Sequence, residues 1–413
     1  MLMATVVIAW ELGGDYGHLA RLLPLAQALR EQGHQPVFVV RDLLGAESLL
    51  QPQGFTALQA PLWLGRLTQL PSPISYAELL MPVGFLNPRA LTGICRAWRQ
   101  LFQLLKPDLL VLDHAPTALL ASRGLGLPRL HFGDGFCMPP STQPLPQFAW
   151  WQAPVGPRLA ESEAHVLSQA NQVLAALGAP ALQTLAQLFD VEAQALCSFD
   201  ALDPYPPALR APDTPRLGPV FLLSQGQQPV WPEAPGPRVF AYLKPGYGPL
   251  EQVLQALQRV PASILLHLPG AARKTLEQYS RGHLRISTEP LAMGAVSAQC
   301  DLALCHGGAG TTALMLLAGK PLALLPMQTE QWMSAHRLQT QGLAAGLLIN
   351  EVERLPQLLQ HVWSEPRYRQ AAQAFAEAHR GYRQEDTIAA VLAQCEALLR
   401  RSSAVEAAGA AAP

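Results

Sequence analysis

The sequence predicts an α/β protein made of two doubly wound domains, each a parallel sheet with helices on both faces. Short apolar runs rich in β-branched residues alternate with helical patterns along both halves of the chain. This alternation is typical of buried parallel strands and their crossover helices. The 413 residues suffice for two or three domains of ordinary size. A segment rich in Gln, Pro and Gly at 224–237 separates the halves, as a linker does.

The first half begins with a predicted strand at Thr5–Trp10, followed by a glycine loop at 13–17. No Lys or Arg precedes the apolar run, so we interpret it as a strand and not as a signal peptide. A helix follows, because apolar residues recur at helical spacing and Gly33 stands at the C-cap position. The other predicted elements are strands at Pro36–Val40, Leu109–Leu112 and Pro128–Phe132, and a helix at Ala118–Gly124.

The second half follows the same logic without repeating the sequence. Its predicted strands are Arg238–Leu243, Ser263–Leu268, Asp301–Cys305 and Pro321–Pro326, and its helices Leu250–Arg259 and Thr311–Ala318. We therefore expect an N-terminal domain over 1–223, a linker over 224–237, a C-terminal domain over 238–385, a helix over 386–401 and a disordered tail over 402–413. The tail is predicted to be disordered because it consists mostly of small residues and its sequence is of low complexity.

The composition excludes several classes of protein. The net charge is −1 and only 14% of residues are charged, whereas nucleic-acid binding requires a basic field. The six cysteines form no CxxC pair, which indicates free thiols in a reducing cytoplasm. We expect a cytoplasmic protein without a transmembrane segment. The sequence contains no Walker A, HExxH or GxSxG motif and no Asp-x-Asp pair, so no metal site is predicted.

The segment Cys305–Thr312 is the strongest candidate binding site. It follows a predicted strand and opens a helix, where glycines allow a ligand to approach the backbone and helical N–H groups are free. The predicted anion ligands suit a diphosphate: His306, Gly307, Gly308, Gly310, Thr311 and Thr312. A tight turn without a ligand is the alternative. Gly308, Gly310 and Ala313 also fit a dinucleotide fingerprint with Glu330 as its acidic residue, but the helix is too short for that site.

The region 301–331 resembles the nucleotide-sugar signature of family 1 glycosyltransferases, in the bacterial branch that includes macrolide and sterol-type enzymes. The resemblance is carried by the glycine loop with its His and two Thr residues, then Gly319-x-Pro321, Pro326 and Glu330-Gln331. The N-terminal half agrees in Gly13-Gly14-x-x-Gly17-His18 and in the stretch from Lys106 to Asp113. The resemblance covers roughly residues 4–395, with weak stretches at 45–100 and 135–210.

The resemblance implies the GT-B architecture: two facing Rossmann-like domains, an inter-domain cleft, and a C-terminal helix that crosses back to the N-terminal domain. It implies that His18 deprotonates the acceptor with Asp113 in support, that the glycine loop binds the diphosphate, and that Glu330 and Gln331 bind the donor sugar. An imidazole titrates near neutral pH and can take a hydroxyl proton. A helix-capping His18, a strand-end Asp113 and a solvated loop at Glu330 are the alternatives for these residues.

Base and acceptor recognition are less specified. The positions where the plant branch binds base and ribose are Thr288, Leu291 and Leu314 here, so UDP and dTDP remain equal candidates. Aromatic residues among prolines at 132–157 suit an apolar acceptor, and Phe136, Trp150 and Trp151 are predicted to line its pocket. Ordinary core packing is the alternative for these three residues.

The sequence thus predicts an inverting, metal-independent hexosyltransferase that moves a sugar from a UDP- or dTDP-sugar to a hydroxyl of a small or lipophilic acceptor. The nucleotide sugar is a co-substrate, and no cofactor is expected. Two alternatives stay open. One is a lipid-linked-sugar transferase of the peptidoglycan-precursor type, which would contact a membrane surface. The other is a sugar-nucleotide-binding protein without transferase activity.

Overall fold

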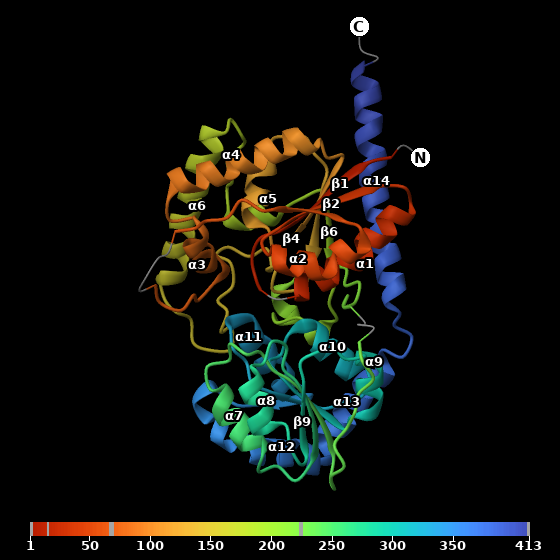
Figure 1. Cartoon of the computed structure of the whole chain (residues 1–413). Coiled ribbons are helices and arrows are strands. Elements are labelled where there is room, and N and C mark those ends of the chain that lie inside the picture. Colours follow the sequence, from red (N-terminus) through yellow and green to blue (C-terminus); the bar gives the residue numbers. More distant parts are fainter. Residues whose placement is uncertain (1–2, 15, 66–69, 223–225, 411–413) are drawn as a thin grey trace. The chain divides into compact units, whose positions relative to one another are not determined.

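The computed structural model describes residues 3–14, 16–65, 70–222 and 226–410, with side chains of the last helix described up to Arg401. The chain divides into two compact units (Figure 1). Unit 1 comprises Met1–Asp200, Tyr205–Val220 and Arg383–Pro413, and unit 2 comprises Ala201–Pro204 and Phe221–Tyr382.

Unit 1 contains a six-stranded parallel sheet in the order β3-β2-β1-β4-β5-β6. Its strands are β1 (Thr5–Trp10), β2 (Gln35–Val40), β3 (Thr56–Gln59), β4 (Leu109–Asp113), β5 (Arg129–Gly133) and β6 (Ala193–Leu196). Its helices are α1 (Gly17–Glu31), α2 (Leu43–Leu49), α3 (Tyr76–Leu80), α4 (Pro88–Leu105), α5 (Pro116–Ser122), α6 (Arg158–Ala176) and α14 (Gln384–Ala410). Figure 1 shows α4, α5 and α6 gathered on one side of this sheet and α1 with α14 on the other.

Unit 2 contains a second six-stranded parallel sheet, in the order β12-β11-β10-β7-β8-β9. Its strands are β7 (Arg238–Tyr242), β8 (Ser263–His267), β9 (Leu284–Ser287), β10 (Leu302–Cys305), β11 (Leu322–Leu324) and β12 (Ala344–Gly346). Its helices are α7 (Leu250–Leu257), α8 (Arg273–Tyr279), α9 (Met293–Gln299), α10 (Ala309–Leu317), α11 (Thr329–Thr340), α12 (Leu355–Ser364) and α13 (Pro366–Ala378).

The predicted fold class is confirmed. Burial of the strands explains why they could be predicted from the sequence. All five residues of β4 and all four of β10 are buried. A strand covered on both faces must be apolar at every position, which produces the continuous runs seen in the sequence. In each sheet the first strand of the unit lies beside the fourth, where the strand order reverses. This reversal is the place where doubly wound sheets bind their ligands.

The last helix, α14, belongs to unit 1. This agrees with the expectation that the C-terminal helix crosses back to the N-terminal domain. Helix α14 packs on α1, and His34 Nε2 lies 2.7 Å from Glu396 Oε1. Helix α14 continues beyond the predicted helix end at 401 to Ala410, and residues 411–413 lie outside the described residues. The segment is rich in alanine, the strongest helix former, so its low complexity does not interrupt the helix.

The predicted linker is not a free connection over its described part. Residues 226–237 are part of unit 2. Gln227 pairs with Leu291 in an isolated bridge, and Trp231 Nε1 donates to Gln299 Oε1 at 2.9 Å. Residues 224 and 225 lie outside the described part of the chain. The Pro- and Gln-rich composition therefore marks a segment without regular structure that lies against α9 and the loop before it.

We predict that α14 stabilises unit 1 through its buried face. Leu398, 4% exposed, lies on that face. Leu398→Ala is expected to lower the free energy of unfolding of unit 1 by about 2–4 kcal/mol, the usual cost of truncating a buried leucine. Amide hydrogen exchange resolves the two units, so β1 and β4 should lose protection while β8 and β10 keep theirs. Arg400→Ala, on the same helix but 68% exposed at the side chain, is the matched control and should change stability by less than about 0.5 kcal/mol.

Candidate active site

The predicted catalytic pair lies where the strand order of unit 1 reverses. Strands β1 and β4 are neighbours, and their register pairs Trp10 with Asp113 at their carboxyl ends. Helix α1 starts at Gly17 and carries His18 in its first turn. The His18 ring stacks on Trp10, with ring centroids 5.2 Å apart and an interplanar angle of 22°. Strand order, register and helix start together bring His18 to Asp113.

The geometry of this pair orients the ring of His18. Its Nδ1 lies 3.0 Å from Asp113 Oδ2. A carboxylate only accepts hydrogen bonds, so the bond to Asp113 requires a proton on Nδ1, and Arg21 Nη2 lies 3.1 Å from the same nitrogen. Asp113 is fully buried, whereas the His18 side chain keeps 11% of its surface exposed. Asp113 thus holds the imidazole at Nδ1, and Nε2 is the ring nitrogen on the side away from that bond.

Gly13 keeps the Nε2 side of the ring uncovered. Its φ of +89° lies in the left-handed region that favours glycine, and a Cβ at this position would collide with Nε2 of His18. Gly13, in the loop after β1, is therefore required for two reasons: its backbone turns the chain, and its missing side chain leaves room for the His18 ring. Any other residue there would displace the ring or cover the nitrogen.

A buried arginine, absent from the prediction, holds the pair in place. Arg21 Nη2 donates to Asp113 Oδ1 at 2.7 Å, and Arg21 Nη1 donates to Asp134 Oδ2 at 2.6 Å. Burial would raise the pKa of Asp113, but Arg21 and His18 outweigh it and keep the pKa below its ordinary value. The pKa of Asp134 is lowered in the same way, against burial, by Arg21. Both carboxylates are ionised, and Arg21 offsets their charge.

A second histidine adjoins the pair. His114 follows Asp113 directly, and its ring lies 5.6 Å from that of His18 and 6.0 Å from Phe136, measured between centroids. Phe136 is buried beside this cluster, whereas Trp150 and Trp151 form an edge-to-face pair of their own at 5.2 Å. Of the three residues predicted for an acceptor pocket, Phe136 is the one whose ring contacts lead to His18 through His114.

Sequence reasoning missed Arg21, Asp134 and His114, although two of them carried a signal. Arg21 stands three residues after His18, on the same face of the helix, and interrupts the apolar residues around it. His114 directly follows the strand-end aspartate. Asp134 follows β5, one strand further along the sheet, and offered no pattern of its own.

The glycine loop of unit 2 connects β10 to α10, again where the strand order reverses. His306 Nδ1 lies 2.7 Å from the carbonyl oxygen of Leu325, and His306 Nε2 accepts from the N–H of Lys244 at 3.0 Å. Both nitrogens are therefore engaged by main chain from the loops after β11 and β7. In this arrangement both ring nitrogens of His306 contact the main chain, and the ring holds the loop in place.

The start of α10 is open to a ligand. Gly307 has a φ of +89°, which turns the chain into the helix, and the Cβ position of Gly308 has no described atom within 4 Å. The first N–H groups of the helix, from Ala309 to Thr311, have no partner within the helix and point outward at its positive end. Thr311 is half-buried there, and Thr312 is buried beside Cys305.

Glu330 and Gln331 open the next helix, α11, and differ in exposure. Gln331 is 3% exposed, and its Oε1 accepts from the N–H of Met327 at 2.9 Å. It closes the turn before α11 and lies against Gly307. Glu330 is half-buried in the first turn of the helix. The pair is adjacent to the glycine loop, and Glu330 is the member that is more exposed to solvent.

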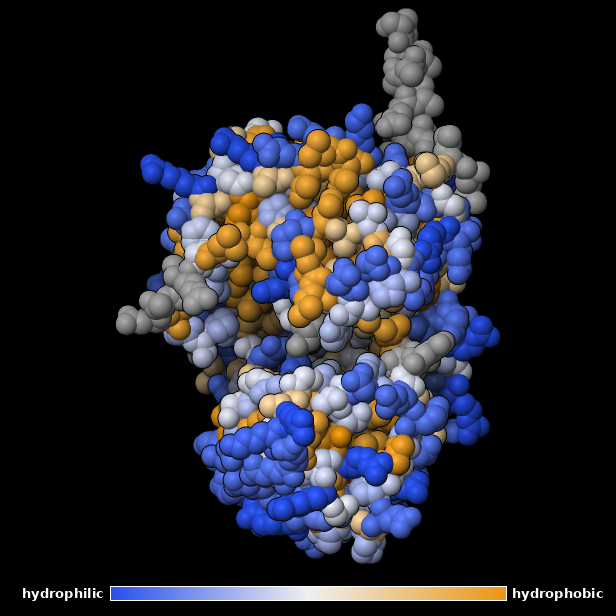
Figure 2. Space-filling view, in the orientation of Figure 1, coloured by the Kyte–Doolittle hydropathy of each residue, from blue (hydrophilic) through white to orange (hydrophobic). Residues whose placement is uncertain are grey.

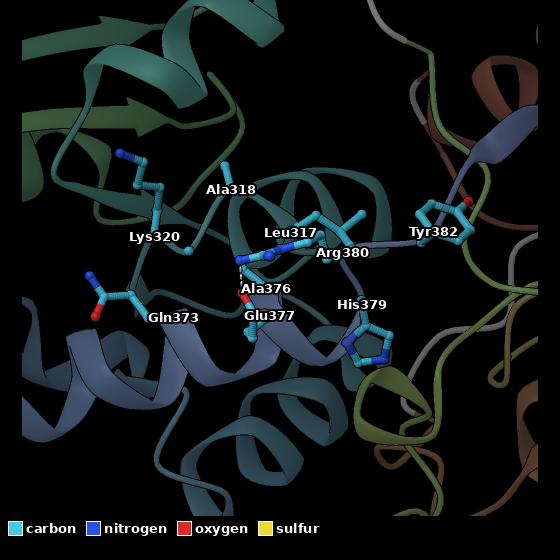
Figure 3. Close-up of a pocket in the computed structure, with 10 residues that line it drawn as sticks. Leu317, Ala318, Lys320, Gln373, Ala376, Glu377, His379, Arg380 and Tyr382 are labelled. Atoms are coloured by element: carbon cyan, nitrogen blue, oxygen red, sulfur yellow. Dashed lines mark hydrogen bonds and ion pairs between the residues drawn. The ribbon is translucent and has the colours of Figure 1, made fainter.

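Unit 2 also has a pocket of about 560 Å³, but it lies at the other end of α10 (Figure 3). Leu317 to Lys320 line one side, and residues from Gln373 to Tyr382 line the rest. Figure 3 shows Arg380 turned toward Glu377, with which it forms an ion pair. The carboxyl end of a helix is negative, so this pocket does not suit a diphosphate.

Comparisons with known proteins identify similar glycosyltransferases. Residues 251–398 match the model of the erythromycin biosynthesis protein CIII-like C-terminal domain. A PGL/p-HBAD biosynthesis glycosyltransferase of Mycobacterium tuberculosis is 26% identical over 324 residues, covering 71% of this chain and 72% of the relative. The chain is a glycosyltransferase with the GT-B fold, and it is similar to family 1 enzymes.

Solved structures give the same architecture. The glycotransferase of kitacinnamycin has a TM-score of 0.70 at 18% identity, covering 96% of this glycosyltransferase and 99% of that chain. The spinosyn rhamnosyltransferase SpnG complexed with thymidine diphosphate has a TM-score of 0.63 at 17% identity, covering 94% and 99% of the two chains. At these identities the likeness concerns the fold.

The glycosyltransferase exposes several large apolar side chains on unit 1. On the face seen in Figure 2, apolar residues are more widespread over this unit than over unit 2. Leu44 on α2 and Leu104 on α4 are 75% and 78% exposed. Within the described ranges, no helix is both long enough and apolar enough to cross a bilayer.

We predict that replacing Arg21 reverses the acid dependence of stability. In the native protein the lowered pKa values of Asp113 and Asp134 contribute stability above the unfolded value of about 4, and this is lost as the pH falls through the lower folded values. In Arg21→Met the buried carboxylates lack their cation, so burial raises their pKa values. The variant should lose about 3–5 kcal/mol at pH 7 and regain stability on acidification toward pH 5.

Urea denaturation at a series of pH values measures this effect. Arg273→Met is the control, because Arg273 pairs with Glu277 at side-chain exposures of 91% and 62%, and exposed pairs contribute little. An Arg21→Met protein whose stability falls with acidification as steeply as that of the native enzyme would show that Arg21 does not govern the two carboxylates.

Proposed function

We propose that the enzyme transfers a sugar from a UDP- or dTDP-sugar to a hydroxyl of a small or lipophilic acceptor by a single inverting displacement. The observation that carries the proposal is the bond between His18 Nδ1 and Asp113, which leaves Nε2 able to take the acceptor proton. As the hydroxyl loses its proton to His18, its oxygen attacks the anomeric carbon from the face opposite the diphosphate. Asp113 stabilises the imidazolium that forms, as in other His–Asp pairs.

The donor side of the proposal rests on the glycine loop. We assign the diphosphate to the N–H groups at the start of α10 and to the hydroxyls of Thr311 and Thr312, with His306, Gly307, Gly308 and Gly310 shaping the loop. Glu330 is assigned to the sugar hydroxyls, and Gln331 supports it. The relative crystallised with thymidine diphosphate supports dTDP as one of the two candidate nucleotides.

The diphosphate charge is proposed to be offset without a divalent metal. In the described part of the chain, His, Cys, Asp and Glu ligand atoms converge at one place, His18, His114 and Cys137, which lies in unit 1. Helix N–H groups and the helix dipole are the cationic elements of the donor loop. EDTA is therefore expected to leave the transfer rate unchanged.

The acceptor side combines His18 with an aromatic surrounding. Phe136 contacts Tyr76, His114 and Phe148, with ring centroids 5.4 to 6.2 Å apart. Aromatic walls suit a flat or apolar acceptor. The similar proteins are named for erythromycin biosynthesis and for PGL/p-HBAD biosynthesis, which supports a small or lipophilic acceptor. All six cysteines are buried and none of them forms a disulfide, and the cytoplasmic location stays a prediction.

Two alternatives are distinguished by different observations. A binding protein without transferase activity would not require a histidine that is oriented by a carboxylate at Nδ1, as His18 is by Asp113. A lipid-linked-sugar transferase needs a membrane-docking face that is both apolar and basic. Arg89, Arg96 and Leu104 are exposed on α4, so binding to anionic vesicles is the measurement that would favour this second function.

We predict that His18→Ala lowers turnover by roughly 10²–10⁴, the range for loss of a general base. Asp113→Asn should give a smaller loss, because it orients and supports the imidazole. The two losses should be strongly non-additive, since both act on one proton transfer. Stopped assays of sugar transfer measure the rates, and calorimetry with UDP and dTDP provides the control. Nucleotide affinity should stay unchanged, since the donor loop belongs to unit 2, and turnover that survives His18→Ala would contradict the assignment.

We predict that the threonines of the loop bind the diphosphate. Thr311→Val and Thr312→Val each remove one hydroxyl at nearly constant shape and should weaken binding of UDP or dTDP by about 1–3 kcal/mol, the cost of one bond to a charged acceptor. Thr340→Val is the matched control, because Thr340 is exposed at the end of α11 and donates to the carbonyl oxygen of Arg337. Nucleotide affinities that are equal in all three variants and the native enzyme would remove the diphosphate from this loop.

A further inference from the structure

His114 is held in an unusual backbone conformation. Its φ of +47° lies in the left-handed region, and its carbonyl oxygen accepts from the N–H of Leu12 at 3.0 Å. This bond ties the chain after β4 to the chain after β1. In a left-handed residue other than glycine the Cβ crowds the following carbonyl oxygen, so this conformation is unfavourable. Such residues persist where the surrounding structure enforces them, and they gather at functional sites.

The side chain of His114 is unusual as well. It is 5% exposed, and among the described residues neither of its ring nitrogens has a hydrogen-bond partner. Burial lowers the pKa of His114 to about 3, so the ring is neutral, with one N–H donor and one acceptor nitrogen. Buried polar groups in native proteins are nearly always paired, and the exceptions call for an explanation. Two unfavourable features in one residue suggest that a ligand supplies the missing partner.

The neighbours of His114 indicate what that ligand is. One ring nitrogen of His114 and one of His18 lie within 4.8 Å of each other. The Tyr76 ring lies 5.9 Å from the His114 ring, and its hydroxyl also lacks a partner in the described part of the chain. Phe136 meets His114 edge to face. Unused neutral hydrogen-bonding groups with aromatic walls thus stand directly beside the proposed base.

A metal ion is the competing occupant, because Cys137 Sγ completes a set of three ligand atoms with His18 and His114. However, Arg21 Nη2 lies 3.1 Å from His18 Nδ1 and 3.8 Å from Cys137 Sγ. A permanent guanidinium cation in the middle of the set opposes the binding of a second cation. The charges around His114 therefore favour a neutral oxygen of an organic ligand.

We propose that His114 is a specificity-determining residue that binds a second oxygen of the acceptor. This oxygen stands on the carbon next to the one whose hydroxyl is glycosylated, because two imidazole rings whose centroids lie 5.6 Å apart can be reached by oxygens on adjacent carbons. The preferred acceptors are then vicinal diols, hydroxy-ketones or hydroxy-ethers on a flat or cyclic frame. The inference rests on the proposed function, in which His18 takes the proton of the first hydroxyl.

Two coumarins test the proposal, 4-methylumbelliferone with one hydroxyl and 4-methylesculetin with a second hydroxyl on the adjacent carbon. Their binding is followed by quenching of tryptophan fluorescence, since Trp10 stacks on His18, and their glycosylation by kcat/KM. The native enzyme should prefer the diol. His114→Phe keeps the ring and removes both nitrogens, so the preference should fall roughly three- to tenfold, the loss expected for one neutral hydrogen bond.

Further variants separate recognition from a structural role. His114→Asn suits the left-handed backbone and should lower the diol preference without lowering Tm. His131→Phe makes the same exchange at another buried histidine, on β5 beside Phe189, and should leave the preference unchanged. His18→Ala should lower turnover of both coumarins by roughly 10²–10⁴ and keep the preference in binding. Turnover that persists there contradicts the proposed function, whereas the binding preference still reports on His114.

Three results would overturn the inference. One is a native enzyme that binds neither coumarin or binds both equally well. Another is an unchanged preference in both His114→Phe and His114→Asn. The third is inhibition of the native enzyme by Zn²⁺ that His114→Phe abolishes while the preference for the diol stays the same, since that result assigns the three residues to a metal instead.

Discussion

The buried guanidinium of Arg21 is the interaction on which the arrangement of unit 1 depends. It bonds Asp113 at the end of β4 and Asp134 after β5, and it comes from the helix that carries His18. Two buried carboxylates so close together would otherwise repel each other and take up protons. By keeping both ionised, Arg21 lets Asp113 hold the proton on His18 Nδ1. The stability of the unit and the proposed basicity of Nε2 thus depend on the same ion pair.

Both units use their topology in the same way. Each sheet reverses its strand order between its first and fourth strands, and the loops after these two strands diverge and leave room for a ligand. In unit 1 this place holds His18 and Asp113, and in unit 2 it holds the glycine loop and Lys244. The difference lies in the residues that follow the strands. Buried charge is concentrated in the first unit, and glycines with free helical N–H groups in the second.

The sequence allowed the sheets to be predicted more fully than the side-chain network. Strands such as Thr5–Trp10 are apolar throughout because both faces are covered, and the motifs around His18 and His306 stand at strand ends. Helix α4 was missed, although Asn87 caps it, because its boundaries lie in a stretch with little resemblance to the family. Arg21 and His114 could not be assigned roles, because a polar side chain is expected at the surface unless the fold shows that it is buried. Nothing local in the sequence reveals that Arg21 meets Asp134, 113 positions away.

Three histidines illustrate how the surroundings decide what the same side chain does. His306 has both nitrogens bonded to main chain, so its ring acts as a brace between the loops of unit 2. His18 has its Nδ1 bonded to a carboxylate and its Nε2 facing a glycine, so its ring is oriented from one side only. His114, as far as the described residues extend, has neither nitrogen bonded. In the proposal a ligand completes the hydrogen bonds of this ring, and the same contact accounts for the left-handed backbone that places the ring there.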